Sequence, residues 1–249
     1  MRAAAWACAL ASLLASAAPP AHESPSVGSD CAAGLPITLV EGATASEKDS
    51  ACRGVERAAA FFAAHLRPPR LDAPAITVRF VDESRLPCMD PQLPAGCSGP
   101  RVAAQFDAAR NLVEMTRARQ PWMSSEARPY FTLPFDRALY DSVLVHEATH
   151  AISKQFYRYE PDERAQDEYV AYASQIWSLS PELRARVVAA YPDVADVGRA
   201  DEGGFNDMVH FFNPHKFGAR SWSHFVGPAG GRAFLERLYS GDFRPPTLE

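Results

Sequence analysis

The stretch VLVHEATHAISKQF, residues 143–156, decides how the rest of the chain is interpreted. It places His146 and His150 four residues apart, with Glu147 directly after the first histidine. Apolar residues surround these polar ones at helical spacing, and positions i and i+4 of a helix project from nearly the same side. Two imidazoles on one side of a helix can bind one metal ion together.

Glu147 lies one position further round this predicted helix, so its carboxylate is offset from both imidazoles. It can reach a water beside the metal without being a ligand. Zinc lowers the pKa of such a water towards neutrality, and a carboxylate can then accept its proton. The spacing therefore predicts His146 and His150 as metal ligands and Glu147 as a general base. A solvated helix surface that carries three polar residues is the alternative interpretation.

Catalytic zinc usually has three protein ligands, so a third residue is needed. The extended pattern H-E-x-x-H-x-x-G-x-x-H fails, because Ser153 and Phe156 stand where it needs Gly and His. The next predicted helix, residues 161–179, offers Asp167 and Glu168. These two carboxylates point about 100° apart on a helix, so only one of them can face the metal.

An H-E-x-x-H helix followed by a glutamate on a later helix resembles the gluzincins, a group of zinc metallopeptidases. The resemblance covers roughly residues 75–180 and favours Glu168 over Asp167 as the third ligand. It implies a zincin-like fold, Zn²⁺ as the cofactor and a peptide or protein substrate. The small Ala171 and the aromatic Tyr172 behind Glu168 also resemble gluzincin glutamate helices. However, Tyr172 stands where some gluzincins place an Asp that orients a histidine, so the groups that support the two histidines are not identified.

Sequence patterns on both sides of the motif predict an α+β fold. Alternating apolar residues predict a strand within 75–84 and two short strands within 101–117, around a turn near Asp107–Arg110. Helices are predicted at 46–66, 136–159, 161–179, 180–192, 202–212 and 229–239, with Ser46 and Ser180 as N-caps. The expected order is thus a small sheet, the motif helix, the glutamate helix and an all-helical C-terminal part.

The C-terminal part offers candidate donors to the oxyanion that forms during peptide hydrolysis. These are His210, His215 and His224, with Arg220, Tyr157 and Tyr169 as further polar groups. A single histidine in an aromatic-rich stretch is usually a packed or capping residue, and this structural role is the alternative for each of the three. By resemblance to zincins, an edge strand would pair with the substrate. RVAAQF (101–106) and NLVEM (111–115) are the candidates, with an ordinary core strand as the alternative.

The N-terminus predicts export. Arg2 precedes an apolar run over 3–14, and Ala15-Ser16-Ala17 fits signal-peptide cleavage, so residues 1–17 are expected to be a signal peptide. A buried N-terminal helix is the alternative. Residues 18–30 are polar and Pro-rich, which predicts a flexible leader. The expected location is periplasmic or extracellular, and no later segment is apolar enough to span a membrane.

Four cysteines remain after the predicted signal, Cys31, Cys52, Cys88 and Cys97. An even number in an exported chain predicts two disulfides, and proximity favours Cys31–Cys52 and Cys88–Cys97 among the three pairings. None belongs to a C-x-x-C pair, which argues against a cysteine-ligated zinc site.

The composition limits the organisation and the partners. A chain of 249 residues with 47% hydrophobic residues is expected to form a single domain over residues 31–249. A net charge of −5 without a basic block argues against nucleic acid and anionic lipid as partners. The oligomeric state is not predicted.

The sequence therefore predicts an exported zinc-dependent peptidase in which Glu147 is the general base. A zincin-fold protein that binds metal or a partner without turnover is the alternative, and a secreted structural domain with a chance motif is the third reading. The presence of Glu147 favours the peptidase, because a site without turnover need not keep its base.

Overall fold

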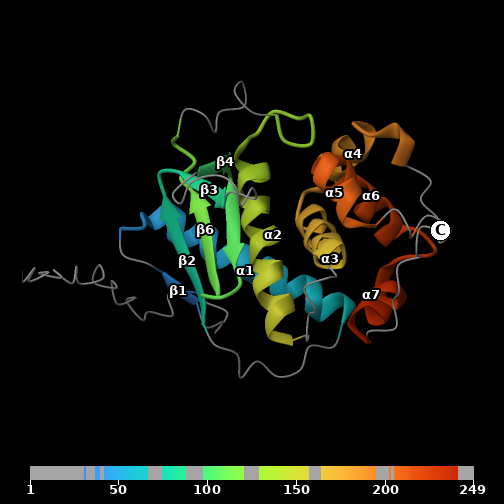
Figure 1. The fold of residues 1–249 in the computed structure, drawn as a ribbon, viewed down its shortest axis with the longest axis horizontal. Helices are drawn as coiled ribbons and strands as arrows, with labels where there is room; N and C mark the ends of the chain where they lie inside the picture. The colour runs from blue at the N-terminus through green and yellow to red at the C-terminus, as the bar shows by residue number, and fades with distance from the viewer. Residues whose placement is uncertain are drawn as a thin grey trace, which may run out of the picture.

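The computed structural model describes residues 31, 37–39, 42–66, 75–87, 98–120, 129–156, 164–194, 202 and 205–240. The predicted signal peptide, the leader, the Cys88–Cys97 pair and Tyr157 lie outside the described residues. Within them the chain is α+β, with a small mixed sheet on one side and helices on the other (Figure 1). This confirms the α+β class that the sequence predicts.

The main sheet has four strands in the order β1 (Ile37–Leu39), β2 (Ile76–Val81), β6 (Leu112–Thr116) and β5 (Ala104–Asp107). β1, β2 and β6 run parallel to one another, and β5 runs antiparallel to β6. A separate antiparallel pair is formed by β3 (Ser84–Pro87) and β4 (Ser98–Val102).

The position of β6 corrects one expectation. β6 is hydrogen-bonded to β2 on one side and to β5 on the other, so the stretch at 111–115 is an interior strand. The edge of this sheet is β5, which belongs to the other candidate stretch, 101–106. Of the two candidate stretches, the one that contains β5 is therefore at the edge of the sheet and could pair with an extended peptide.

The helices follow the predicted order with one addition. They are α1 (Ala45–His65), α2 (Arg137–Phe156), α3 (Arg164–Trp177), α4 (Pro181–Ala189), α5 (Asp207–Phe212), α6 (Pro214–Val226) and α7 (Gly231–Ser240). A short 3₁₀ turn covers Pro192–Val194. The sequence did not predict α6.

The N-caps are partly as predicted. Ser180 caps α4, where Pro181 occupies the first turn. Thr44, and not Ser46, caps α1, because the Thr44 hydroxyl accepts from the Glu47 amide while the Glu47 carboxylate accepts from the Thr44 amide. This reciprocal pair satisfies two amides at once, which a cap at Ser46 would not do.

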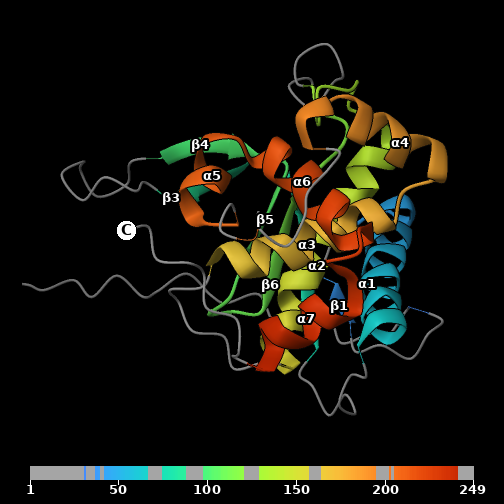
Figure 2. The ribbon, with the colours of Figure 1, turned by 90° about the vertical axis from the view of Figure 1, so that its right-hand side faces the viewer.

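Helix α2 lies between the sheet and the later helices, with α1 and α3 packed against it (Figures 1 and 2). The contact with α1 is close because Gly54 has no side chain. A Cβ atom at Gly54 would lie 1.9 Å from Cδ2 of Leu144, two residues before His146. The glycine therefore determines how near α1 comes to the motif helix.

A second glycine allows close contact on the far side of α3. A Cβ atom at Gly218 of α6 would lie 2.5 Å from Cδ1 of Tyr172, which is one turn after Glu168 on α3. Buried apolar side chains from the sheet and the helices form one contiguous core around α2 and α3. The motif helix α2 is thus packed closely against α1, and the glutamate helix α3 is packed closely against α6.

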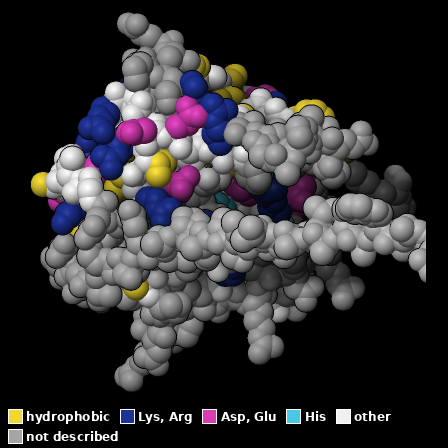
Figure 3. Space-filling view, turned by 60° about the vertical axis from the view of Figure 1, so that its left-hand side comes forward, with side chains coloured by type: hydrophobic (Ala, Val, Ile, Leu, Met, Phe, Trp, Pro, Cys, Tyr) yellow, Lys and Arg dark blue, Asp and Glu magenta, His cyan; other side chains and the backbone are white. Residues whose placement is uncertain are grey.

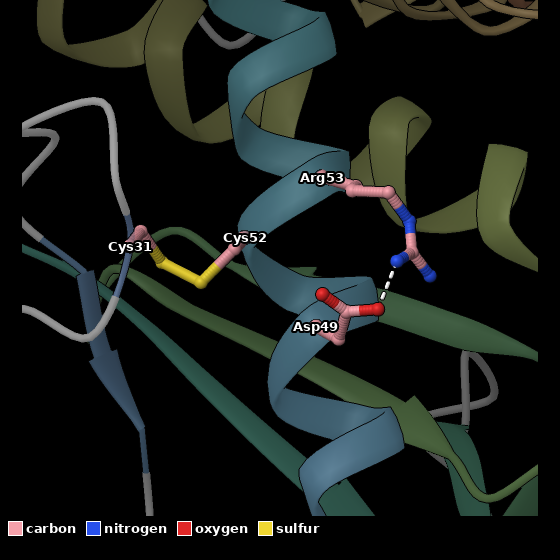
Figure 4. Close-up of a disulfide and its surroundings, with 4 residues drawn as sticks. All are labelled: Cys31, Asp49, Cys52 and Arg53. Carbon is pink, nitrogen blue, oxygen red and sulfur yellow. Dashed lines mark hydrogen bonds and ion pairs between the residues drawn. A yellow bond between two sulfur atoms is a disulfide. The ribbon is translucent and has the colours of Figure 1, made fainter.

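Cys31 and Cys52 form a disulfide, which confirms one of the two favoured pairings (Figure 4). The bond joins the segment that precedes β1 to α1, beside the Arg53–Asp49 ion pair on the same helix.

Among the helices of the described ranges, none combines the length and the apolar character that crossing a membrane requires.

Candidate metal centre

His146 and His150 on α2 and Glu168 on α3 bring three ligand atoms together. The two Nε2 atoms are 3.2 Å apart. Glu168 Oε2 lies 3.3 Å from Nε2 of His146 and 3.8 Å from Nε2 of His150. Ligand atoms that surround a tetrahedral zinc at about 2.0–2.2 Å lie about 3.3–3.6 Å from one another. The three residues could therefore hold a metal ion with little rearrangement.

The group is nearly enclosed by protein. His146, Glu147 and His150 are 7%, 9% and 8% exposed, and the Glu168 side chain is 12% exposed. Figure 3 shows a face of the molecule on which a small area of histidine is visible in a hollow, between acidic and basic side chains. Low exposure strengthens electrostatic interactions inside the group.

The two glutamates have their pKa values shifted in opposite directions. Burial raises the pKa of Glu147, and the neighbouring His146 and His150 only partly offset this effect. Burial also disfavours the charge of Glu168, but the hydrogen bond to His146 and the nearby histidines lower its pKa overall. Environments that separate two carboxyl groups in this way suit one for accepting a proton and the other for remaining an anion.

Asp167 contacts His150 on the side of the ring that faces away from the three ligand atoms. Nδ1–H of His150 donates to Asp167 Oδ2 over 2.6 Å, which leaves Nε2 for a metal. A carboxylate in this position fixes the orientation of a metal-binding imidazole. Of the two carboxylates that the sequence left as alternatives, Glu168 therefore joins the ligand group and Asp167 supports it.

This carboxylate sets an expected pH dependence for the metal-free protein. Burial alone would lower the pKa of His150, but Asp167, with Glu168 and Glu147, raises it to about 10 from the usual 6.5. Because the folded state binds this proton more tightly, the added stability is complete below pH 6.5 and is lost as the pH rises through 10. We expect the urea midpoint to fall across this window, and to fall less in Asp167→Asn.

Equilibrium unfolding in the presence of a chelator measures this effect. The matched control is Asp82→Asn, which removes an exposed carboxylate on the surface near Arg119. A wild-type midpoint that stays constant from pH 6.5 to 10 would contradict the assignment of Asp167 to His150.

Gln175 supports the other histidine, although it is not among the site residues that the sequence predicts. Nδ1 of His146 lies 3.1 Å from Gln175 Oε1. The Gln175 amide nitrogen donates to Tyr130 Oη and to Ser142 Oγ, each over 3.1 Å. Gln175 is fully buried and lies two turns after Glu168 on α3, so a signal was present in the helical spacing.

Among the three C-terminal histidines, His210 reaches the ligand group. Nε2 of His210, on α5, lies 3.4 Å from Glu168 Oε2. Burial lowers the pKa of His210, although Glu168 acts in the opposite direction. A neutral imidazole at this position has one N–H to donate.

The other candidate donors contact different parts of the molecule. The His215 ring packs on Tyr130 at 4.5 Å between centroids. His224 is fully buried and accepts from or donates to the Tyr169 hydroxyl over 2.9 Å, with Glu202 3.6 Å from its other nitrogen. The Arg220 guanidinium lies over the Phe205 ring. These contacts identify His224 and Tyr169 as a buried structural pair.

The edge strand β5 borders the same group. Phe106 of β5 lies parallel to the His150 imidazole, with 6.4 Å between the ring centroids and 8° between the planes. Tyr172 covers the His146 ring from the opposite helix, with 4.5 Å between centroids. The two histidines are therefore held by aromatic contacts as well as by hydrogen bonds.

Comparison with known proteins gives a family and no activity. Residues 38–246 match a protein family described as a family of unknown function, DUF6639. Neither the curated proteins nor the solved structures contain a match to this chain. Because the matched region covers most of the sequence, the chain belongs to the DUF6639 family.

Proposed function

We propose that this protein is an exported zinc-dependent peptidase. The observation that carries the proposal is the triangle of His146 Nε2, His150 Nε2 and Glu168 Oε2, with Glu147 beside it on α2. Two imidazoles and one carboxylate are a typical donor set for catalytic zinc, which keeps its fourth position open. The gluzincin resemblance of the sequence points the same way, and we propose a zincin-like arrangement for the fold.

Bound to these three residues, zinc would lower the pKa of a water molecule and polarise the carbonyl of the scissile bond. Glu147 would accept one proton from that water while the oxygen of the water forms a bond to the carbonyl carbon. The same carboxyl group would then pass the proton to the nitrogen of the leaving amine as the C–N bond breaks. The raised pKa of Glu147 supports this double role.

Two further groups would act on the substrate. His210 would donate a hydrogen bond to the oxyanion, since its Nε2 lies 3.4 Å from Glu168 Oε2 and its pKa is lowered by burial. The edge strand β5 would pair with the backbone of an extended peptide, since Phe106 of this strand packs on His150. An exported location is supported by the Cys31–Cys52 disulfide, which an oxidising compartment favours.

The test is a zinc and cleavage assay on the purified chain. We expect about one zinc per chain by elemental mass spectrometry. We also expect cleavage of unfolded casein that stops with a chelator and resumes when zinc is restored. Zinc without cleavage of casein or of a mixed peptide library would favour the alternative, a metal- or partner-binding protein without turnover. Absence of zinc would leave the motif without a metal role.

A further inference from the structure

We propose that Ser142 and Tyr130, acting through Gln175, fix the tautomer of His146 so that its Nε2 is free to bind a metal ion. Ser142 and Tyr130 are thus positioning residues, since neither contacts the ligand atoms. The inference rests on the metal-binding part of the proposed function and not on peptide cleavage. It can therefore be tested even if the protein hydrolyses nothing.

The hydroxyl of Ser142 determines which way the Gln175 amide points. Ser142 Oγ lies 2.7 Å from the carbonyl oxygen of Leu139, and a carbonyl can only accept. The single proton of Ser142 is therefore used in that bond. The Gln175 atom 3.1 Å from Ser142 Oγ must then be a donor, which identifies it as the amide nitrogen.

Tyr130 gives the second hydrogen of this amide nitrogen an acceptor, over 3.1 Å. With both hydrogens used, Gln175 presents its carbonyl oxygen Oε1 to Nδ1 of His146, 3.1 Å away. Because that oxygen can only accept, Nδ1 must carry the hydrogen. When Nδ1 carries the one hydrogen of a neutral imidazole, Nε2 has the lone pair that a metal requires, and a bound metal would replace the hydrogen bond between Nε2 and Glu168.

An amide needs this support in a way that a carboxylate does not. His150 faces Asp167, whose two oxygens both accept, so either orientation of the carboxyl group gives the same tautomer. A reversed Gln175 amide would point N–H groups at Nδ1 of His146 and would move the ring hydrogen to Nε2. The orientation of Gln175 therefore matters whereas that of Asp167 does not, and the hydroxyl oxygens of Ser142 and Tyr130 fix it by accepting from the Gln175 amide nitrogen.

Tyr130 is held in place by a strained turn. The backbone amides of Tyr130 and Leu133 each donate to the other residue's carbonyl over 2.9 Å, which closes a two-residue turn. Its central residues, Phe131 and Thr132, have φ values of 51° and 61°. Two successive non-glycine residues in the left-handed region are costly, and a β-branched residue there is rare.

Packing keeps this turn in its strained form. Phe131 is fully buried, and its ring packs on Tyr172 and on His215, at 6.1 and 5.3 Å between centroids. Residues with unfavourable φ persist where the surroundings determine their position, and they cluster at functional sites. The backbone of Tyr130 is therefore held without Gln175, and its ring packs on Phe135 and His215, at 5.2 and 4.5 Å between centroids.

The decisive experiment measures zinc affinity by competition with a chromophoric chelator. We expect Ser142→Ala and Tyr130→Phe each to weaken zinc binding about 10-fold, by analogy with groups that orient metal ligands. In a Gln175→Met background, which is itself weakened, adding either substitution should cause no further loss. Matched controls are Ser178→Ala, which removes a hydroxyl bonded to the backbone of Gln175, and Tyr140→Phe, which removes a buried hydroxyl elsewhere.

The outcomes separate this inference from the proposed function. If wild-type protein binds zinc and the two variants bind it as tightly as the controls, the inference is overturned and the metal site stands. Losses that persist unchanged in the Gln175→Met background would also overturn it, because the effect would not pass through the amide. If the wild-type protein binds no zinc, both are overturned. Thermal unfolding of the metal-free variants verifies that each one folds.

Discussion

Glu147→Gln should lower kcat/KM for peptide cleavage by about 10²–10⁴-fold while zinc remains bound, because the amide cannot accept a proton from water. The substitution keeps the size and the hydrogen-bonding span of the side chain. His146, His150 and Glu168 keep their own contacts, so zinc content should not change. Steady-state cleavage of a quenched fluorescent peptide, with parallel zinc analysis, measures both quantities.

The matched control for this variant is Glu114→Gln. Glu114 lies on β6, where it accepts from Ser84 and Gln105 and does not contact the ligand group. It should lose some stability and little activity. If Glu147→Gln keeps full activity, Glu147 is not the general base. If the variant loses zinc, Glu147 takes part in metal binding, which is a role that we do not assign to it.

The second large effect concerns Glu168. Removal of this carboxylate in Glu168→Ala leaves two histidines to hold the metal, so zinc affinity should fall by more than the roughly 10–100-fold expected for a supporting residue. Asp167→Ala should show that smaller loss, because Asp167 contacts only the Nδ1 side of His150. Chelator competition on both variants and on the wild-type protein ranks the two carboxylates.

Thermal unfolding provides an independent measurement of the same ranking. A ligand that binds only the folded state raises the midpoint, and at a fixed concentration the rise is larger when the ligand binds more tightly. Added zinc should therefore raise the midpoint of the wild-type protein most, that of Asp167→Ala less, and that of Glu168→Ala least. The reverse order for the two variants would exchange the roles of Asp167 and Glu168.

Local patterns predicted most elements because their causes are local. Alternating residues in β2 and the turn between β5 and β6 follow from side-chain periodicity. Helix α6 was missed because Asn213-Pro214 resembles a turn, whereas in the structure Asn213 caps the helix and Pro214 occupies its first turn. An Asn-Pro dipeptide can form a turn or begin a helix, and the packing of the residues that follow it determines which of the two occurs.

The candidate site was predicted in outline, and the remaining details depend on how α3 is rotated. The spacing in the sequence shows that Asp167 and Glu168 cannot both face the metal. Which of them does so depends on the buried residues of α3, such as Ala165 and Tyr169, and on the Gly218 contact beyond. Gln175 shares the face of Glu168 on α3, so once Glu168 is taken as the ligand, helical spacing places Gln175 beside the histidines as well.

The three C-terminal histidines show a limit of a different kind. His210, His215 and His224 have similar surroundings in the sequence, but α5 ends and α6 begins at the Asn213-Pro214 junction, so one helix does not carry all three. His210, on α5, is the one of the three that reaches Glu168. No periodicity spans such a junction, so sequence spacing could not rank the three.

The division of the centre between two helices has a consequence for cooperativity. Helix α2 supplies His146, Glu147 and His150, and α3 supplies Glu168 together with the residues that hold both imidazoles. The centre is thus an interface, and it exists only while these helices are docked. A bound ion would make α2 and α3 unfold together. Without the ion, α3 would open before α2, and the amides of α3 would then exchange their hydrogens faster than the amides of α2. Metal occupancy would then decide whether the helical half unfolds as one body or in parts.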